Sequence, residues 1–242
     1  MTLKEKLYQA LLHYAARAGH GVGQPVRAVL FDMDGVLYDS MPGHARAWQG
    51  MCRESGIDCD PDEFFGYEGM TGAATIDLLF RRQFGRAATP DDAKRLYARK
   101  SELFAAQGTP IIMPGAQSAV ASVVAHGARC VLVTGSGQGS LLTRLNGDYN
   151  DAFQLRVTAY DVTHGKPDPE PYLVGLQKAG VQAAHALAVD NAPLGVQSAS
   201  AAGIFTIGVR TGPLPEGALL AAGADIEINS MNECTILLSY LL

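Results

Sequence analysis

The sequence has few cysteines and no long apolar run. Its four cysteines form no CxxC pair and no metal-ligand spacing, so we expect reduced thiols in a cytoplasmic protein. No apolar stretch reaches the roughly 18 residues that a membrane-spanning helix needs. Residues 1–24 combine charged side chains with leucines at helical spacing, which predicts a helical extension packed on the surface rather than a signal peptide.

Positive charge is scarce as well. The chain has 19 lysines and arginines against 24 aspartates and glutamates, which gives a net charge of −5. Nucleic acids and anionic membranes attract proteins with a basic surface, so we expect neither as a partner. Any ligand that carries phosphate would have to be held by a local site. We expect the protein to be a monomer or a weak dimer.

Apolar residues are abundant: 48% of the 242 residues are hydrophobic and 18% are charged, which is enough for a sizeable core. Six short apolar runs predict buried strands, namely Ala28–Phe31, Cys130–Val133, Leu155–Thr158, Ala186–Val189, Ile204–Val209 and Ile226–Ile228. From Pro114 onward these runs alternate with helical patterns. Such alternation predicts an α/β fold, with a parallel sheet and helices on both of its faces.

Residues 41–112 break this rhythm. They contain three helical patterns with no convincing strand between them, at Ala45–Ser55, Ala73–Phe84 and Pro90–Ala106. About 70 residues are too many for a simple connection in a compact domain. We therefore expect residues 41–112 to form a helical domain inserted after the first strand, and residues 25–40 and 113–242 to form the core domain.

Polar side chains follow four of the predicted strands, at the point where each strand ends. They are Asp32 and Asp34 after the first strand, Thr134 and Ser136 after the second, Lys166 in the loop after the third, and Asp190 and Asn191 after the fourth. Open α/β sheets bind ligands at the carboxyl ends of their strands. The sequence therefore predicts that these side chains share one site.

These residue types suit the chemistry of phosphate esters. Carboxylate and carboxamide oxygens are ligands that Mg²⁺ prefers. Asp32 could attack phosphorus and form an aspartyl-phosphate, while Asp34 could protonate the leaving oxygen and later deprotonate the attacking water. Thr134 and the N–H groups after it could donate to phosphoryl oxygens, and Lys166 would supply positive charge.

Each residue by itself has a simpler interpretation. Asp32 and Asp34 could cap a turn, and Lys166 could be a solvated loop lysine. Thr134 and Ser136 could begin the following helix as N-cap residues. Only the ordered series of all four strand ends favours a catalytic site.

The four motifs resemble those of the haloacid dehalogenase superfamily, from about Arg27 to the C-terminus. In order they read FDMDGVLYDS, VLVTGS, HGKPDPEPY and LAVDNAPLGVQSASAAG. The resemblance implies a Rossmann-like parallel sheet core with an inserted helical cap domain. Through DSMPGHARAW and HGKPDPEPY the chain is most similar to the β-phosphoglucomutase-like branch.

The resemblance assigns Asp32 as the nucleophile and Asp34 as the general acid and base. It implies that Mg²⁺ is bound by the Asp32 carboxylate, the backbone carbonyl of Asp34 and the pair Asp190 and Asn191. The family generally carries two acids at that pair, and Asn191 aligns with the more important ligand. A carboxamide contributes no negative charge, so the resemblance predicts weaker Mg²⁺ binding here.

The resemblance also bears on the substrate. It places Gly135 and Ser136 at the phosphate, and it matches His44 and Lys100 to substrate-binding residues of the cap. In β-phosphoglucomutases a cap arginine holds the second phosphate of a bisphosphate, and that position is Gly72 here.

We therefore expect a Mg²⁺-dependent phosphatase that acts on a small phosphorylated metabolite, such as a sugar phosphate, through an aspartyl-phosphate. One alternative is a β-phosphoglucomutase-type sugar phosphomutase. Another is a non-catalytic protein that binds phosphorylated metabolites, which only Asn191 favours.

Overall fold

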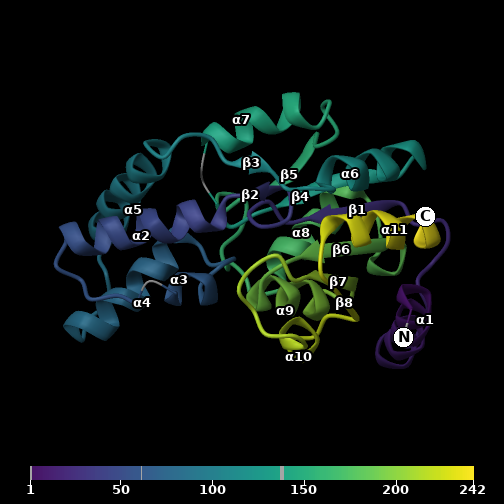
Figure 1. Ribbon diagram of the computed structural model, residues 1–242. Helices are drawn as coiled ribbons and strands as arrows, with labels where there is room; N and C mark the ends of the chain where they lie inside the picture. Colours follow the sequence, from purple (N-terminus) through teal and green to yellow (C-terminus); the bar gives the residue numbers. More distant parts are fainter. Residues whose placement is uncertain (1, 61, 137–138) are drawn as a thin grey trace.

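A six-stranded parallel sheet forms the centre of the molecule in a computed structural model that describes residues 2–60, 62–136 and 139–242 (Figure 1). The strands run in the order β5-β4-β1-β6-β7-β8. Their bounds are β1 Ala28–Phe31, β4 Arg129–Val133, β5 Leu155–Val157, β6 Ala186–Asp190, β7 Phe205–Val209 and β8 Ile226–Ile228. All six predicted strands are present, and the predicted α/β fold with a parallel sheet is confirmed.

Helices cover both faces of the sheet, and the alternation along β1 shows why. Val29 and Phe31 point into one apolar cluster, whereas Ala28 and Leu30 point into the other, because successive strand residues face opposite ways. The first face is covered by α6 Ala116–Ala125, α7 Gly139–Asp148 and α11 Met231–Leu241, and the second by α8 Glu170–Ala179 and α9 Pro193–Ala201. A short helix, α10 Ala218–Ala221, packs against α9. The sequence patterns did not single out α7 or α11.

The N-terminal residues form a helix, α1 Leu3–Ala18, that packs on the core. It begins with a capping box between Thr2 and Glu5, which satisfies free N–H groups at the helix start. Tyr14 is fully buried, and its hydroxyl donates a hydrogen bond to the carbonyl oxygen of Gly203 at 3.0 Å. The predicted extension is thus attached to the core through a buried aromatic side chain.

The helices between β1 and β4 form a bundle beside the sheet, at the left of Figure 1. The bundle comprises α2 Met41–Glu54, α3 Glu63–Gly66, α4 Gly72–Phe84 and α5 Pro90–Ala105. It has an apolar cluster of its own, which includes Trp48, Met51 and Leu79. Two short antiparallel strands that the sequence did not indicate, β2 Tyr38–Asp39 and β3 Ile111–Ile112, join it to the sheet. We call this bundle the cap.

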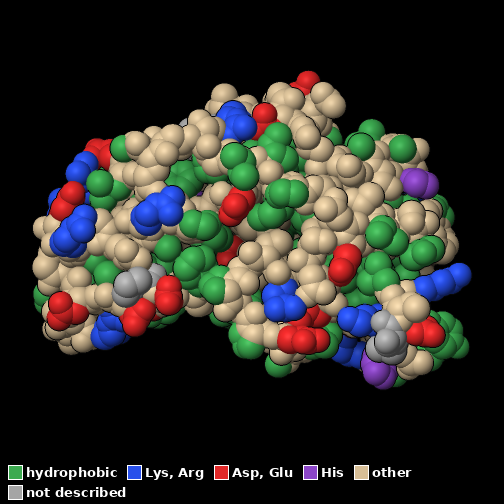
Figure 2. Space-filling model, viewed as in Figure 1, with side chains coloured by type: hydrophobic (Ala, Val, Ile, Leu, Met, Phe, Trp, Pro, Cys, Tyr) green, Lys and Arg blue, Asp and Glu red, His purple; other side chains and the backbone are tan. Residues whose placement is uncertain are grey.

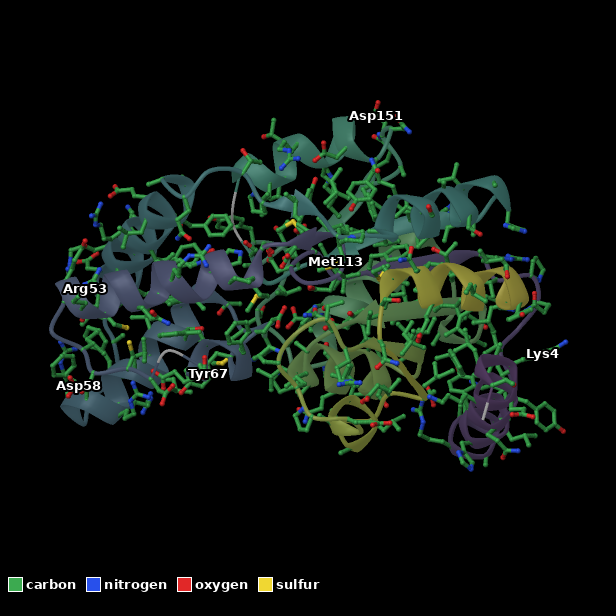
Figure 3. All side chains as sticks on the ribbon, in the orientation of Figure 1. Lys4, Arg53, Asp58, Tyr67, Met113 and Asp151 are labelled. Carbon is green, nitrogen blue, oxygen red and sulfur yellow. The ribbon has the colours of Figure 1, made fainter. Side chains whose placement is uncertain are left out.

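The junction between cap and core can be followed in Figure 3, where Tyr67 lies on the cap side and Met113 on the core side. The backbone N–H of Met113 donates to the carbonyl oxygen of Leu37 at 2.9 Å, which holds the returning chain against the outgoing one. On the face shown in Figure 2, acidic and basic side chains are mixed over the cap, without a large patch of one sign.

Among the described residues, no helix combines the length and the apolar character that a membrane span requires.

Candidate active site

The ends of the central strands bring two carboxylates and one lysine into contact. Asp32 follows β1, Asp190 ends the neighbouring β6, and Lys166 reaches them from the loop after β5. The Lys166 Nζ donates to Asp32 Oδ1 at 2.6 Å and to Asp190 Oδ2 at 2.7 Å. All three side chains are buried. Residues separated by up to 158 positions therefore form one ion-paired cluster, because β1 and β6 are adjacent in the sheet.

This cluster carries more negative than positive charge. Burial raises the pKa of Asp32 to about 8; Lys166 opposes this rise, and the charges of Asp190 and Asp34 add to it. Burial alone would lower the pKa of Lys166, but the two carboxylates outweigh burial and raise it. A lysine that stays charged between two carboxylates compensates only one of them. A further positive charge at this place would stabilise the ionised form of Asp32.

Both oxygens of Asp190 accept hydrogen bonds from protein donors. Its Oδ2 accepts from the Tyr172 hydroxyl at 2.7 Å as well as from Lys166, and its Oδ1 accepts from the backbone N–H of Ala192 at 3.0 Å. The carboxylate also lies so close to α9 that a Cβ atom on Gly195 would overlap it. Asp190 is therefore fixed over the start of α9, where the helix dipole favours a negative charge.

Asn191 has a different environment from its neighbour. Its Nδ2 donates to Glu68 Oε1 at 2.8 Å, whereas its Oδ1 is buried and accepts no hydrogen bond from any described residue. A buried acceptor without a partner is costly, because it has lost its hydration. Glu68 belongs to the cap, between α3 and α4, and is itself buried. Burial raises its pKa well above the usual range, and the charges of Asp32 and Asp190 add to this.

Asp34 is held by a chain of hydrogen bonds from the cap side. Its Oδ1 accepts from Ser40 Oγ at 2.5 Å and lies 3.0 Å from His44 Nε2, while Lys100 Nζ lies 2.6 Å from His44 Nδ1. Because the Lys100 ammonium can only donate, the Nδ1 of His44 is an acceptor and its Nε2 carries the proton. His44 also stacks on Phe104, with ring centroids 4.0 Å apart. The predicted cap residues His44 and Lys100 thus meet at Asp34.

The chain of hydrogen bonds sets the ionisation of these groups. Burial would raise the pKa of Asp34, but His44 and Ser40 outweigh it and hold the pKa below its usual range. Burial lowers the pKa of His44, and Lys100 contributes to the same direction. Burial also lowers the pKa of Lys100 to about 8, against the attraction of Asp34. At neutral pH the arrangement is an ionised Asp34, a neutral His44 and a charged Lys100.

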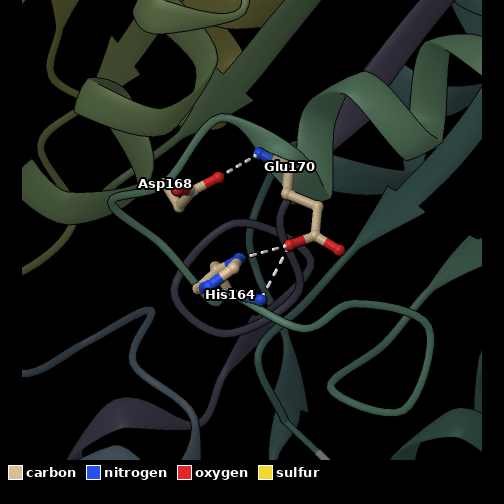
Figure 4. A group of neighbouring side chains, drawn as sticks. All are labelled: His164, Asp168 and Glu170. Atoms are coloured by element: carbon tan, nitrogen blue, oxygen red, sulfur yellow. Dashed lines mark hydrogen bonds and ion pairs between the residues drawn. The ribbon is translucent and has the colours of Figure 1, made fainter.

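The loop that carries Lys166 is fixed by its own polar side chains, as Figure 4 shows. Glu170 accepts from the backbone N–H groups of Thr163 at 2.8 Å and His164 at 2.7 Å, and Asp168 Oδ1 accepts from the N–H of Glu170 at 2.8 Å. His164, Asp168 and Glu170 also lie close enough together to bind a metal ion. Their hydrogen bonds instead explain the cluster as a clamp that shapes the turn before α8 and presents Lys166 to the sheet.

Thr134 lies buried at the end of β4, and its Oγ1 accepts from the backbone N–H of Ser136 at 3.0 Å. The described part of the following helix, α7, begins at Gly139, and residues 137–138 before it lie outside the described residues. The N-cap interpretation of Thr134 and Ser136 therefore stays a prediction. Thr134, Gly135 and Ser136 line the cavity above Asp32, where a phosphoryl group would approach.

The cavity between cap and core has a volume of about 60 Å³. Its wall combines the strand-end residues with cap residues, among them His44, Trp48, Glu68, Tyr97 and Lys100. Ligand pockets usually have volumes of at least about 300 Å³. The cavity as it stands is therefore small for a sugar phosphate, and we expect the cap to move when such a substrate enters.

Comparison with known proteins agrees with this geometry. Residues 26–203 match the family model described as haloacid dehalogenase-like hydrolase. The chain belongs to this family. Hexitol phosphatase A from Escherichia coli (strain K12) is 29% identical over 211 residues, which are 87% of this chain and 94% of that protein. Beta-phosphoglucomutase from Bacillus subtilis (strain 168) is 25% identical over 219 residues, 87% of this chain and 92% of the other.

A solved structure from Bacteroides vulgatus, provisionally described as a beta-phosphoglucomutase, is more similar still. It shares 42% of its sequence with this chain, covers 98% of it and 97% of its own length, and superimposes with a TM-score of 0.92. The resemblance to the β-phosphoglucomutase-like branch is thus confirmed. The protein is an enzyme with phosphatase or phosphomutase activity.

Gly72, the position that the resemblance matches to the mutase arginine, lies against Tyr97. A Cβ atom on Gly72 would overlap the ring of Tyr97, so α5 leaves no room for a longer side chain there. Tyr97 and Lys100 come from the same helix and both line the cavity. No arginine lines the described part of the cavity.

Three arginines of the cap helices pair with carboxylates outside the cavity. Arg81 pairs with Asp77 at 2.7 Å, Arg82 pairs with Glu63, and Arg99 pairs with Glu54 at 2.7 Å. All three arginine side chains are at least 40% exposed, and none lines the cavity.

Three residues of the site escaped the sequence reasoning: Ser40, Glu68 and Tyr172. Ser40 lies in the DS pair of the first motif, two residues after β2 begins, so its place in the motif was the available signal. Tyr172 lies two residues inside α8 and is the last residue of the third motif, HGKPDPEPY, so its place in the motif was also an available signal. Glu68 lies in a cap loop and has no local pattern that distinguishes it from a core or a surface residue.

Proposed function

We propose that the protein is a Mg²⁺-dependent phosphatase that hydrolyses a small phosphorylated metabolite, such as a sugar phosphate, through an aspartyl-phosphate on Asp32. The observation that carries the proposal is the buried cluster of Asp32, Lys166 and Asp190 directly below Asp34 and the cap. Relatives named as a hexitol phosphatase and as a phosphorylated carbohydrates phosphatase support this substrate class.

The residues present fit a divalent cation. The unpartnered Oδ1 of Asn191 is a buried acceptor, and Lys166 alone cannot compensate the carboxylates around it. Asp32, the backbone carbonyl of Asp34 and Asn191 would hold the ion, whereas the oxygens of Asp190 are taken by protein donors. When bound, Mg²⁺ would neutralise charge on the phosphate and so let a carboxylate approach an anion.

In the first step, an oxygen of Asp32 forms a bond to phosphorus while the bond from phosphorus to the leaving oxygen breaks. Lys166 holds the Asp32 carboxylate in place and stabilises charge on the phosphoryl group. Asp34 gives a proton to the leaving oxygen. It takes up this proton from solvent when the substrate binds, because the negative charge of the bound phosphate raises the pKa of a buried carboxylate.

In the second step, Asp34 takes a proton from water, and the hydroxide forms a bond to phosphorus as the bond to Asp32 breaks. Inorganic phosphate leaves and the Asp32 carboxylate is restored. His44 stays neutral throughout and orients Asp34 through its Nε2 proton. Among the described residues that line the cavity, Lys100 is the lysine, and its positive charge is placed to attract the rest of the substrate.

Tyr97 supports hydrolysis of the phosphate ester rather than transfer of the phosphoryl group to another position of the sugar. A mutase must grip the second phosphate of its bisphosphate, and arginine does so with a bidentate, charge-assisted contact. Here the resemblance matches that arginine to Gly72, and Tyr97 lies against Gly72, so we expect water to attack the aspartyl-phosphate. We also propose a small phosphate ester as the sole class of partner, without nucleic acid or membrane, in a monomer or weak dimer.

A phosphate-release screen tests the proposal. Sugar phosphates, hexitol phosphates and nucleotides are incubated with Mg²⁺ and the protein, beside an Asp32→Asn control. We expect release from phosphorylated sugars or hexitols by the unmodified protein only. Turnover by neither protein, together with retained ligand binding, would indicate a non-catalytic binding protein.

Phosphorus NMR separates hydrolase from mutase. β-Glucose 1-phosphate is followed with Mg²⁺ and a catalytic amount of glucose bisphosphate. We expect slow release of inorganic phosphate. Rapid accumulation of glucose 6-phosphate with little free phosphate would establish the mutase instead.

A further inference from the structure

The cap reaches the proposed metal site through one short loop. Residues 67–71 connect α3 to α4, and we call them the docking loop. Its backbone lies against the catalytic loops: a Cβ atom on Gly135 would lie 2.7 Å from the carbonyl oxygen of Gly69, and one on Gly69 would lie 3.2 Å from the side chain of Lys166. Such close approach is possible only because both positions are glycines. Glu68 is the carboxylate that this loop inserts into the core.

The contact between Glu68 and Asn191 determines how the carboxamide is oriented. Glu68 Oε1 accepts a hydrogen bond from Asn191 Nδ2. The Asn191 side chain also packs on Gly35, where a Cβ atom would overlap the carboxamide. The amide is therefore held from two sides. With its nitrogen turned to Glu68, the oxygen is the group left without a partner among the described residues. That oxygen is the atom through which a carboxamide binds a hard cation.

A carboxylate that accepts a hydrogen bond from a ligand commonly strengthens that ligand. It fixes the ligand's orientation and increases the electron density on the coordinating atom. In this family the corresponding pair is generally formed by two acids, so Asn191 leaves the site one negative charge short. The orientation of its carboxamide oxygen then matters more, and Glu68 Oε1 lies 2.8 Å from the Nδ2 of the same carboxamide.

We propose that Glu68 is a positioning residue for the metal: by accepting the N–H of Asn191, it orients the carboxamide oxygen of Asn191 toward the cation. This inference rests on the proposed Mg²⁺-dependent function. It has a consequence for the cap. Because Glu68 meets Asn191 only when the docking loop is seated, metal binding and cap closure favour each other, and the coupling is reciprocal.

The test measures metal affinity directly, without turnover. Mn²⁺ replaces Mg²⁺, and free Mn²⁺ is followed by electron paramagnetic resonance in the full-length protein without substrate. Four proteins form a cycle: the unmodified chain, Glu68→Gln, Asn191→Asp and the double variant. Glu102→Gln is the matched control, because it removes the same charge from an exposed position of the cap. Circular dichroism establishes that each variant is folded.

We expect Glu68→Gln to weaken Mn²⁺ binding about 10- to 100-fold, the usual loss when such a partner of a ligand is removed. In the Asn191→Asp background, Glu68→Gln should weaken Mn²⁺ binding less than about threefold, because the aspartate has no N–H group from which Glu68 could accept a hydrogen bond. Equal losses in both backgrounds would show that Glu68 acts only as a charge and would overturn the orienting role. No loss in the unmodified background would overturn the proposal entirely.

Hydrogen exchange tests the coupling to the cap. In the unmodified protein, Mg²⁺ should slow exchange in the docking loop, and Glu68→Ala should abolish this slowing while exchange in β1 and β6 stays unchanged. If Mg²⁺ still slowed hydrogen exchange in the docking loop of Glu68→Ala, cap closure would not be coupled to the metal through Glu68, and the proposed coupling would be wrong. Failure of the proposed function would look different: the protein would bind Mn²⁺ but release no phosphate from any ester.

Discussion

Core and cap hold their functional groups in different ways. In the core, Asp32 and Asp190 lie at the ends of neighbouring strands, and the register of backbone hydrogen bonds sets their separation. In the cap, His44, Glu68 and Lys100 come from two helices and a loop, and they reach the site only because side chains pack across the junction. The comparison teaches that the sheet places the reacting groups, while the cap adds groups that a change in packing can withdraw. The predictions below separate these two contributions.

The largest effect should come from the core. Asp32→Asn removes the nucleophile, and we expect turnover to fall by about 10⁴-fold or more, since loss of a nucleophile removes the covalent route. The loss should be the same for every substrate, because Asp32 meets only the phosphoryl group. Phosphate release from several esters measures it. Near-normal turnover in a rigorously purified variant would exclude Asp32 as the nucleophile.

Asp34 lies in the core but is held by cap residues, and the loss of activity when it is replaced should depend on the substrate. We expect Asp34→Asn to slow hydrolysis of an alkyl phosphate by about 10²- to 10⁴-fold, the usual value of general acid–base catalysis. An aryl phosphate with an activated leaving group should lose less, because its leaving oxygen needs no proton. Steady-state rates on the two esters test this. Equal losses would argue against proton transfer to the leaving group.

The cap has a smaller apolar cluster than the sheet, and it should unfold by itself. Leu79 is fully buried in that cluster. Leu79→Ala should cost about 2–5 kcal/mol, the usual effect of removing a buried leucine side chain. Hydrogen exchange should then accelerate in α2–α5 but not in β1, β4 or β6. Arg81→Ala, on the exposed face of the same helix, is the control.

If the strands also exchange faster in Leu79→Ala, the cap and the core unfold as one unit, and the distinction between them does not extend to stability.

The smallest effect concerns pH. The pKa of Lys100 is lowered to about 8, so its ammonium is charged below that pH and becomes neutral above it. We expect kcat/KM to fall up to about tenfold per pH unit above pH 8, because this parameter reports ionisations of the free enzyme. Lys100→Met should have a lower kcat/KM at pH 7 and no such decline. Lys94→Met, an exposed change on the same helix, should keep the decline.

Much of the site could be predicted because parallel strands end at one edge of a sheet. Asp32, Lys166 and Asp190 each follow a recognisable apolar run, so their meeting needed only the sheet itself. Glu68 could not be found in this way. It lies 123 residues from its partner Asn191, and a single glutamate in a cap loop has no local pattern. The sequence showed that Asn191 lacks a charge, but not which residue orients its carboxamide.

Gly72 is a similar case. Alignment by motif placed it where the mutases have an arginine, yet only the structure shows that Tyr97 occupies the space. The contact joins the start of α4 to the middle of α5, two helices whose mutual orientation depends on packing in the cap. Side-chain packing between helices is not encoded by periodicity, which states only that a face is apolar.

By itself, the sequence determined the strands, the order of the four motifs and the residues at the strand ends, because these follow from short apolar runs and local turns. The sequence pointed to His44 and Lys100 in the cap, but tertiary structure alone decided what the cap side chains contact: His44 and Lys100 at Asp34, Glu68 at Asn191, and Tyr97 over Gly72. The physical reason is distance along the chain. These contacts depend on how the cap packs on the core, and that packing is the sum of many weak interactions between distant segments.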